Sequence, residues 1–325
     1  MEEVIVDKKD SVSVCIIIAY FGQLPSNVNI WLKSCAWNPK VDFLVCSDVK
    51  KSNLPGNVRW INMTFSQFRE MAEQKLQMKI QLETPYECCD FKAVYGIIFE
   101  DYLSGYDYWG YCDMDMVFGD LYHFFEKYEL TKYDRFHHLG HLSLMRNTEE
   151  NNNRYKLPCT PGFGYKDAFV SKGTTHFDEM EINRIFKIYG FPIFDCRICA
   201  DISPQFKRMR ISGAEIQNYN HQTFFWQNGK VWRAYFEKTA TLKNICLDEF
   251  AYIHFQKREM KTPDVDWDKV DRFYITSNGY EVKKELGFPD LKTIKKLNPF
   301  RGKLFEDYEA FSFKVKRKIK TLTER

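Results

Sequence analysis

Strand-length apolar segments alternate with segments of helical periodicity over the first 130 residues. Residues 12–21 form a β-branched apolar run that stops before Gly22, which is typical of a buried strand. Residues 27–35 have apolar side chains at helical spacing, and residues 41–48 form a second strand-length run. This order predicts a β-α-β unit at the start of the chain, and therefore a parallel sheet.

The same alternation continues after this unit. We expect a short strand at 58–61, helices at 66–81, 91–103 and 121–128, and a further strand at 107–113. Asp90 is placed to cap the helix expected at 91–103. The predicted fold class is therefore α/β, with a mixed, mainly parallel sheet and flanking helices. In such sheets ligands bind at the carboxyl ends of the strands.

The second half of the chain has a less regular pattern. We expect a strand at 141–145, a polar loop at 147–154 that can close over a substrate, a helix at 180–189 and a hairpin at 223–236. The hairpin prediction rests on Asn228-Gly229, because this dipeptide fits the tight two-residue turn between antiparallel strands.

No clear linker divides the sequence, so we expect one domain with an elaborated C-terminal half. It would span residues 1–290, with a nucleotide-binding half at about 12–130 and an acceptor half at about 131–290. Residues 291–325 would form a separate tail.

The composition excludes several classes of protein. Hydrophobic residues make up 44% and aromatic residues 17% of the chain, so extensive disorder is excluded. The longest apolar run, 14–21, is much shorter than the roughly 20 residues that cross a bilayer, and the acidic start does not resemble a secretory signal. The cysteines are scattered within apolar runs, which is typical of reduced thiols. Together these features predict a cytoplasmic protein.

Positive charge is concentrated in the tail. Residues 291–325 carry 11 Lys and Arg against 4 Asp and Glu, whereas residues 1–290 carry 36 against 40. Residues 1–290 carry no excess positive charge, which argues against nucleic acid as a partner. Residues 301–325 mix basic and apolar side chains, which predicts a basic amphipathic helix that can lie peripherally on an anionic membrane, such as the inner face of the plasma membrane.

Two acidic residues stand at the end of the strand expected at 107–113. Asp113 and Asp115 are separated by one residue, so both carboxylates can face one ion. Carboxylate oxygens are hard ligands that suit Mg²⁺ or Mn²⁺. The sequence therefore predicts a divalent metal site at this point.

In this context the sequence resembles the GT-A class of nucleotide-sugar glycosyltransferases, in which an Asp-X-Asp motif ends a strand and holds the donor diphosphate through a metal ion. Residues 90–96, 99–103 and 108–115 look like bacterial glycosyltransferases of capsule and exopolysaccharide loci. Residues 20–22 and 252–258 also resemble that uncharacterised group. The resemblance covers about residues 12–260 and implies a GT-A, Rossmann-like fold.

The resemblance implies a role for particular residues of this chain. Asp113, Asp115 and His254 would bind Mn²⁺ or Mg²⁺. The nucleotide-sugar donor, expected to be a UDP-sugar, would contact a larger set of side chains: Tyr20, Phe21, Asp48, Lys92, Asp113, Lys257 and Arg258. The acceptor would be a growing capsular or cell-surface glycan, or a lipid-linked oligosaccharide. The sequence identifies neither the sugar nor the acceptor.

The expected reaction explains these residue types. Cleavage of a sugar–diphosphate bond leaves negative charge on the departing oxygen, which a metal ion and basic side chains stabilise. If the reaction inverts the anomeric carbon, a carboxylate must also take the proton of the acceptor hydroxyl. Our candidates for that base are Asp178 and Glu179, followed by Asp195 and Asp201.

Two other functions remain open at this point. The segment around Asp113 also resembles the nucleophile motif of haloacid-dehalogenase-type phosphatases and phosphotransferases, in which this aspartate would form a phospho-enzyme. Several expected strands precede it here, however, and the later acidic metal motif of that class is missing. The third alternative is a non-catalytic protein that binds carbohydrate through surface Tyr and Trp, which would leave the metal-binding residues without a role.

Overall fold

The computed structural model describes residues 11–236, 244–256, 258–282 and 289–323. The chain forms two compact units that are interleaved in sequence. Unit 1 consists of Met1–Leu24, Pro39–Asp113 and Phe125–Cys196, and unit 2 consists of Pro25–Asn38, Met114–Phe124 and Arg197–Arg325. These boundaries differ from the expected contiguous halves, which meet at residue 130.

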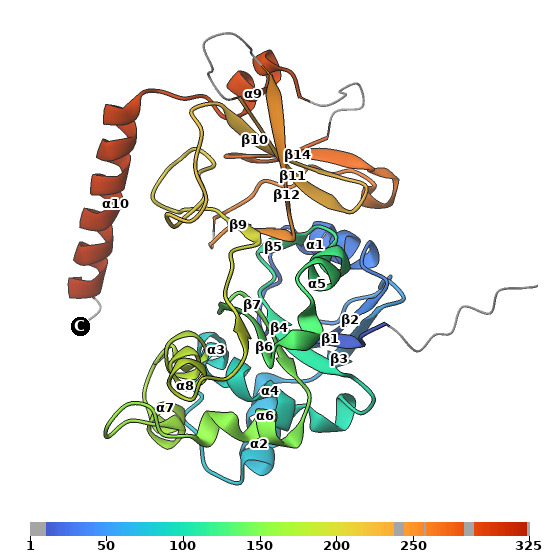
Figure 1. Ribbon diagram of the computed structural model, residues 1–325, viewed down its shortest axis with the longest axis vertical. Helices are drawn as coiled ribbons and strands as arrows, with labels where there is room; N and C mark the ends of the chain where they lie inside the picture. Colours follow the sequence, from blue (N-terminus) through green and yellow to red (C-terminus); the bar gives the residue numbers. More distant parts are fainter. Residues whose placement is uncertain (1–10, 237–243, 257, 283–288, 324–325) are drawn as a thin grey trace, which may run out of the picture. The chain divides into compact units, whose positions relative to one another are not determined.

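Unit 1 contains a seven-stranded sheet in the order β3-β2-β1-β4-β7-β6-β8 (Figure 1). Neighbouring strands are parallel, except that β7 is antiparallel to both β4 and β6. The predicted α/β class with a mixed, mostly parallel sheet and flanking helices is confirmed. The strands are β1 (Val14–Ala19), β2 (Val41–Ser47), β3 (Val58–Asn62), β4 (Tyr108–Cys112), β6 (Arg135–Leu139), β7 (Leu142–Arg146) and β8 (Ile193–Phe194).

The central strand β1 marks the point where the strand order reverses. The chain passes from β1 to β2 and β3 on one side, and β4 then pairs with the other side of β1. Strands β1 and β4 are buried almost throughout, as expected for parallel strands covered on both faces. In open α/β sheets the crevice outside such a reversal is the usual ligand site, and here Tyr20 and Asp113 follow the two strands.

Short helices flank this sheet. Helix α4 contacts both β4 and α2, and α6 contacts β7. The α-helices of unit 1 are α2 (Phe65–Leu76), α3 (Cys88–Phe91), α4 (Tyr95–Ile98), α6 (Glu149–Asn153), α7 (Tyr165–Val170) and α8 (Ile182–Ile188), and α5 (Leu121–Lys127) crosses the boundary with unit 2. The 3₁₀ turns are η1 (Pro85–Glu87), η2 (Lys92–Val94), η3 (Glu100–Tyr102), η4 (Leu130–Lys132) and η5 (Arg154–Lys156), and η6 (Phe177–Glu181) is a π-helix.

Three of the expected elements differ in the structure. The helix expected at 66–81 ends at Leu76, because Gln77 adopts the left-handed conformation and its N–H bonds back to the last turn. The helix expected at 91–103 is instead α3, η2, α4 and η3. Most residues of α3, η2 and α4 are buried, so tertiary packing overrides the periodicity there, whereas η3 has no buried residue. The loop expected at 147–154 contains α6, capped by the Thr148 side chain.

Asp90 does not cap the expected helix. It lies inside α3, and its two carboxylate oxygens accept the backbone N–H groups of Thr175 (2.6 Å) and Phe177 (2.9 Å). The carboxylate therefore fixes the start of η6 against α3.

Unit 2 contains two sheets. A five-stranded antiparallel sheet has the order β12-β11-β10-β14-β15, and a three-stranded sheet has the order β5-β13-β9 (Figure 1). The expected hairpin is confirmed as β10 and β11, with Asn228 and Gly229 both at positive φ in its turn. The strands are β5 (Met116–Phe118), β9 (Cys199–Asp201), β10 (Gln222–Gln227), β11 (Lys230–Phe236), β12 (Ile245–Phe250), β13 (Tyr252–His254), β14 (Arg272–Thr276) and β15 (Gly279–Glu281).

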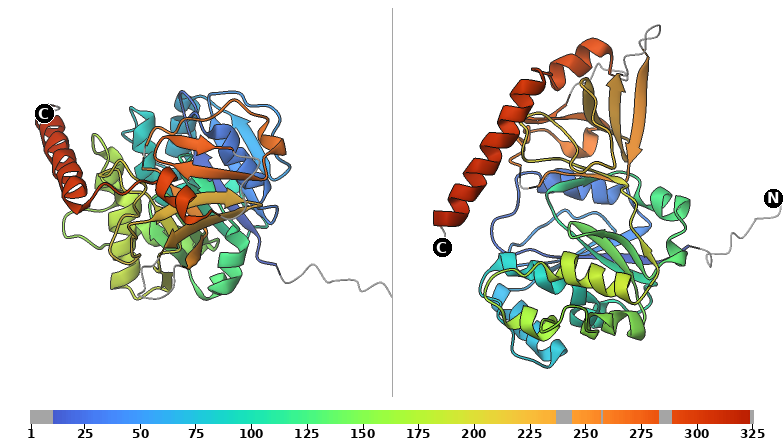
Figure 2. Two further views of the ribbon diagram at one scale, coloured as in Figure 1. Left: turned by 90° about the horizontal axis from the view of Figure 1, so that it is seen from above. Right: turned by 60° about the vertical axis from the view of Figure 1, so that its left-hand side comes forward.

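The helices of unit 2 are α1 (Val28–Ala36), η7 (Trp267–Lys269), α9 (Leu291–Leu297) and α10 (Lys303–Thr323). Figure 2 shows α10 as a single long helix, which confirms the helix expected in the tail. No helix in the described ranges has both the length and the apolar character needed to cross a membrane. All ten cysteines are free thiols, as expected.

Candidate functional site

The turns after β1 and β2 are joined by a carboxylate. Asp48 follows β2, and its Oδ1 accepts the backbone N–H of Gly22 at 2.8 Å. Tyr20 is partly exposed, and its hydroxyl donates to the carbonyl of Gln23 at 3.2 Å. Phe21 is buried, and its ring centroid lies 5.4 Å from that of Phe68 in α2, so this ring belongs to the core. Of the three residues predicted here to contact the nucleotide-sugar donor, Phe21 therefore packs in the core instead.

A buried lysine holds the end of β4. Lys92 in η2 donates to Asp113 Oδ1 (2.6 Å) and to the carbonyl of Gly140 (2.9 Å), and its Nζ lies 5.6 Å from the centroid of the Tyr111 ring. Burial alone would lower the pKa of Lys92, but nearby negative groups, Asp113 first among them, outweigh it and hold that pKa well above its usual value. A permanent positive charge is therefore fixed beside Asp113.

Asp178 is a buried carboxyl on η6. Among the described residues none donates a hydrogen bond to its side chain, although Arg135 donates to its backbone carbonyl at 3.1 Å. Burial raises the pKa of Asp178 to about 7, and neighbouring carboxylates add to this effect, while Lys92 opposes it. A carboxyl that titrates near neutral pH can accept or donate a proton in a reaction.

Two of the other predicted bases, Glu179 and Asp195, have different surroundings. Glu179 Oε1 accepts the backbone N–H of Gly140 at 2.6 Å, and a Cβ at Gly140 would lie only 2.7 Å from the Glu179 side chain. Glu179 thus fixes the β6–β7 loop whose carbonyl also binds Lys92. Asp195 is exposed and follows β8, the edge strand of the sheet, so the structure does not bring it to Lys92 and Asp113.

Unit 2 gathers a second set of polar residues around its three-stranded sheet. His254 ends β13, between β5 and β9, and is paired in register with Met116 on one side and Asp201 on the other. Asp115 immediately precedes β5, and its carbonyl accepts the N–H of Phe255 at 2.9 Å. These main-chain contacts bring Asp115, His254 and Asp201 together although they are far apart in the sequence.

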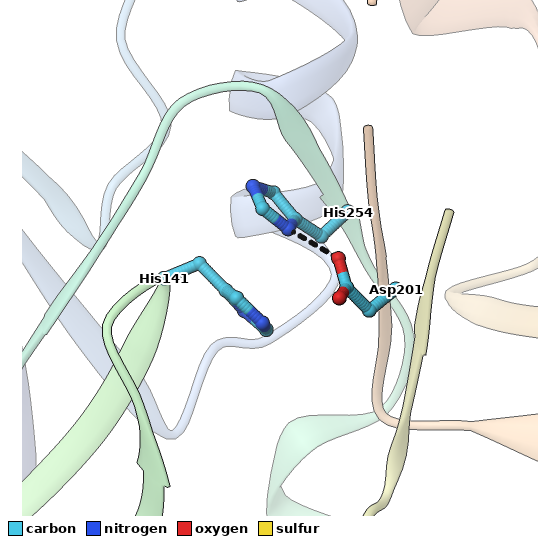
Figure 3. A group of neighbouring side chains, drawn as sticks. All are labelled: His141, Asp201 and His254. Carbon is cyan, nitrogen blue, oxygen red and sulfur yellow. Dashed lines mark hydrogen bonds and ion pairs between the residues drawn. The ribbon is translucent and has the colours of Figure 1, made fainter. Parts of the chain in front are cut away.

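The imidazole of His254 lies between two carboxylates. Its Nδ1 is 2.8 Å from Asp201 Oδ1, as Figure 3 shows by the dashed line, and its Nε2 is 3.4 Å from Asp115 Oδ1. The third side chain in Figure 3, His141, comes from the β6–β7 loop of unit 1. An ionised carboxylate only accepts, so we assign the ring proton to Nδ1. In the neutral ring the lone pair of Nε2 is then on the side of Asp115, and in the protonated ring an N–H is.

This arrangement suits a cation. Two electron-rich atoms that face one another need a positive charge between them, which can be a proton or a metal ion. At 3.4 Å the Nε2–Oδ1 distance is longer than an ordinary hydrogen bond of 2.7–3.2 Å. Two ligands at right angles, each about 2.1 Å from an octahedral ion, lie about 3 Å apart. The spacing is compatible with two ligands of one divalent ion, and equally with an ion pair between a protonated imidazole and Asp115.

Asp201 is held in turn by further contacts. Its Oδ2 accepts from Gln256 Nε2 (2.7 Å) and lies 3.7 Å from Arg197 Nη1. A carboxylate behind a histidine fixes the ring orientation and increases the basicity of its other nitrogen, which is a common support for metal-binding histidines. The sequence predicted Asp201 as a candidate base, whereas in the structure both its carboxylate oxygens have side-chain partners. The sequence did not predict its pairing with His254, because the β9–β13 register is a tertiary feature.

Asp113 is linked to this group by chain connectivity. Asp113 and Asp115 are two residues apart, so their Cα atoms lie within about 7 Å of each other in any conformation of the chain. The carboxylate of Asp113 forms the ion pair with Lys92 in unit 1.

Of the two basic residues predicted after β13, Arg258 is described, and its contacts lie elsewhere in unit 2. Lys257 lies outside the described residues. The guanidinium of Arg258 donates to the carbonyls of Ser203 (3.1 Å), Phe206 (2.6 Å) and Lys207 (2.8 Å), so it ties together the backbone of unit 2. Burial lowers the pKa of Arg258 below its usual value.

Comparison with known proteins gives a family without an assigned activity. The model described as "Family of unknown function (DUF6625)" matches residues 16–284, which is most of the chain. No curated protein matches the sequence.

Proposed function

The chain belongs to a family of unknown function, DUF6625, and we propose from the chemistry of its residues that it is a metal-dependent GT-A glycosyltransferase. It would transfer one sugar from a nucleotide donor, with UDP as the expected nucleotide, to a growing cell-surface glycan or a lipid-linked oligosaccharide. Asp113, Asp115 and His254 would hold Mn²⁺ or Mg²⁺.

The observation that carries this proposal is the geometry of His254. Its Nδ1 is held by Asp201 at 2.8 Å, and its Nε2 is 3.4 Å from Asp115 Oδ1. At this separation both atoms can be ligands of one ion, and in the absence of an ion the two carboxylates favour a protonated imidazole. A nitrogen and an oxygen ligand supported from behind by a carboxylate are typical of a divalent metal site.

Unit 1 supports the donor half of the proposal. The mostly parallel sheet reverses its strand order between β1 and β4, which is the usual ligand site of such sheets. Lys92 and Asp113 lie at the end of β4. When bound, the divalent ion would neutralise negative charge on the departing diphosphate. Lys92 would add a fixed positive charge for the same anion, and Asp48 would orient the turn after β1.

Asp178 is the best candidate for proton transfer. Its pKa of about 7 lets it exist as a base at neutral pH and still accept a proton from an acceptor hydroxyl. Glu179 would act as a positioning residue, because it holds the loop whose carbonyl binds Lys92. Such a base is required only if the reaction inverts the anomeric carbon.

Calorimetric titration with a panel of nucleotides, with and without Mn²⁺, tests the proposal. We expect UDP to bind only when Mn²⁺ is present. Asp115→Asn and His254→Ala should abolish that binding, whereas the exposed controls Asp268→Asn and His123→Ala should retain it. UDP binding that is independent of metal and of Asp115 would contradict the proposal.

The same proteins separate the alternative functions. A phosphatase that uses Asp113 would release phosphate from an aryl phosphate and would lose this activity in Asp113→Asn, without needing a nucleotide. A carbohydrate-binding protein would bind oligosaccharides equally well before and after chelation of metal. Either result would replace the glycosyltransferase assignment.

A further inference from the structure

The helix α10 (Lys303–Thr323) has an apolar stripe that is exposed to solvent. Its members are 40% to 87% exposed and follow one another at intervals of three or four residues, so they lie on one side of the helix. They are Leu304, Tyr308, Phe311, Val315 and Ile319. An amphipathic helix of a globular protein ordinarily buries such a stripe, so its exposure requires an explanation.

The opposite side of the helix is fixed to unit 2 by acidic residues. Glu306 is only 4% exposed and forms ion pairs with Arg208, at 2.7 Å, and with Arg210. One turn further along, Glu309 Oε2 accepts the backbone N–H of Lys207 at 3.3 Å. At 100° per residue, Glu306 and Glu309 lie on the side of the helix away from the apolar stripe.

These ion pairs determine which face of α10 points outward. If the helix rotated to bury its apolar stripe on unit 2, Glu306 and Glu309 would turn toward solvent. Arg208 would then remain buried without the carboxylate of Glu306. Removing one partner of a buried ion pair costs much free energy, because the other charge stays buried without compensation. The structure therefore presents the apolar face to the surroundings and holds it there.

The charges along α10 are divided between its two halves. The acidic residues Glu306, Asp307 and Glu309 all lie in the first half, whereas residues 310–319 carry four basic residues and no acidic one. By helical spacing, Lys314 and Lys318 flank one edge of the apolar stripe and Lys316 lies beyond the other edge. Apolar side chains bordered by lysines are typical of helices that lie in a membrane interface.

We propose that the exposed face of α10 binds the surface of an anionic membrane. The apolar stripe would enter the boundary between headgroups and acyl chains, and the basic residues would contact the acidic headgroups. A second copy of the chain is a poorer occupant for this face. Parallel pairing of two α10 helices would bring their basic halves together, and antiparallel pairing would offer each basic half mainly Asp307, because Glu306 and Glu309 already bind unit 2. This binding surface would be present whichever reaction the chain catalyses.

Vesicle flotation of the full chain tests the inference. We expect binding to vesicles that contain phosphatidylglycerol and little binding to phosphatidylcholine alone. Neutralising Lys314, Lys316 and Lys318 together with glutamine should weaken binding by roughly fivefold per charge, or about a hundredfold in all. High salt should weaken the binding of the unmodified protein in the same direction.

A matched pair of variants tests the apolar stripe. Phe311→Glu should remove vesicle binding, whereas Ile188→Glu, at an exposed site on α8, should leave it unchanged. Both side chains are largely exposed, so both variants should fold, and circular dichroism checks this. Analytical ultracentrifugation of the same proteins reports self-association.

Several results would overturn the inference. They are absence of binding to anionic vesicles, equal binding to neutral ones, and equal effects of Phe311→Glu and Ile188→Glu. A dimer that Phe311→Glu dissociates, without vesicle binding, would identify a second copy of the chain as the partner.

Discussion

Replacing Asp178 by asparagine should remove a pH-dependent loss of stability. Asp178 is buried on η6, and none of the described residues donates a hydrogen bond to its carboxylate. Burial raises the pKa of Asp178 from 3.8 to about 7. Asparagine has nearly the same shape but cannot ionise, so the comparison isolates the effect of the charge.

The size of the effect follows from this pKa. Between about pH 4 and pH 7 the carboxyl is ionised in the unfolded chain but keeps its proton in the folded protein. The unfolded state then binds fewer protons, so the free energy of unfolding falls as the pH rises through this window. A tenfold change in proton affinity corresponds to about 1.4 kcal/mol, so the loss should reach about 4 kcal/mol above pH 7.

Urea denaturation of the wild type and Asp178→Asn across pH 4 to 8 measures this loss. The stability of the variant relative to the wild type should increase by up to about 4 kcal/mol from the acidic to the alkaline end. Asp195→Asn, at an exposed aspartate of the same unit, is the matched control for the removal of one carboxylate. Parallel pH profiles for the wild type and Asp178→Asn would refute the role of burial.

Two further substitutions test the contacts around the proposed metal and donor residues. Asp201→Asn should weaken Mn²⁺ binding about 10- to 100-fold, because His254 loses the carboxylate that orients it; calorimetry measures this, and unchanged affinity would remove Asp201 from the site. Lys92→Met should lower the free energy of unfolding by about 1–3 kcal/mol, less than for a fully buried pair because Asp113 is partly exposed. Denaturation checks this value, and a change below about 0.5 kcal/mol would show that the ion pair contributes little.

The sequence predicts the central strands of the main sheet well because they are covered on both faces. A strand such as β1 must be apolar at almost every position, and this pattern is visible without knowledge of its neighbours. Asn228-Gly229 predicts its hairpin for an equally local reason, since both residues tolerate positive φ.

Elements that depend on tertiary contacts are predicted less well. The segment 91–103 has helical periodicity, but residues 91–96 are buried in succession and its backbone alternates between α and 3₁₀ geometry. Asp90 has the position of a helix cap in the sequence. In the structure it instead accepts hydrogen bonds from the N–H groups of Thr175 and Phe177, which lie 85 and 87 positions further along the chain. The interleaving of the two units is likewise invisible, because nothing local marks 25–38 and 114–124 as parts of unit 2.

The candidate site also combines residues that the sequence indicates with residues that only tertiary contacts reveal. Asp113 and Asp115 are recognisable from their place at the end of a strand, and a resemblance to a known family points to His254. The pairing of His254 with Asp201 depends on the register between β9 and β13, which the sequence does not express. The pKa of Asp178 is equally a product of burial.

The central claim is that His254 and Asp115 share a divalent ion, and pulsed electron paramagnetic resonance of bound Mn²⁺ tests it most directly. We predict a hyperfine coupling from an imidazole nitrogen that is present in the wild type and in His123→Ala and absent in His254→Ala. Tight Mn²⁺ binding without any imidazole coupling, or no Mn²⁺ binding at all, would contradict the claim.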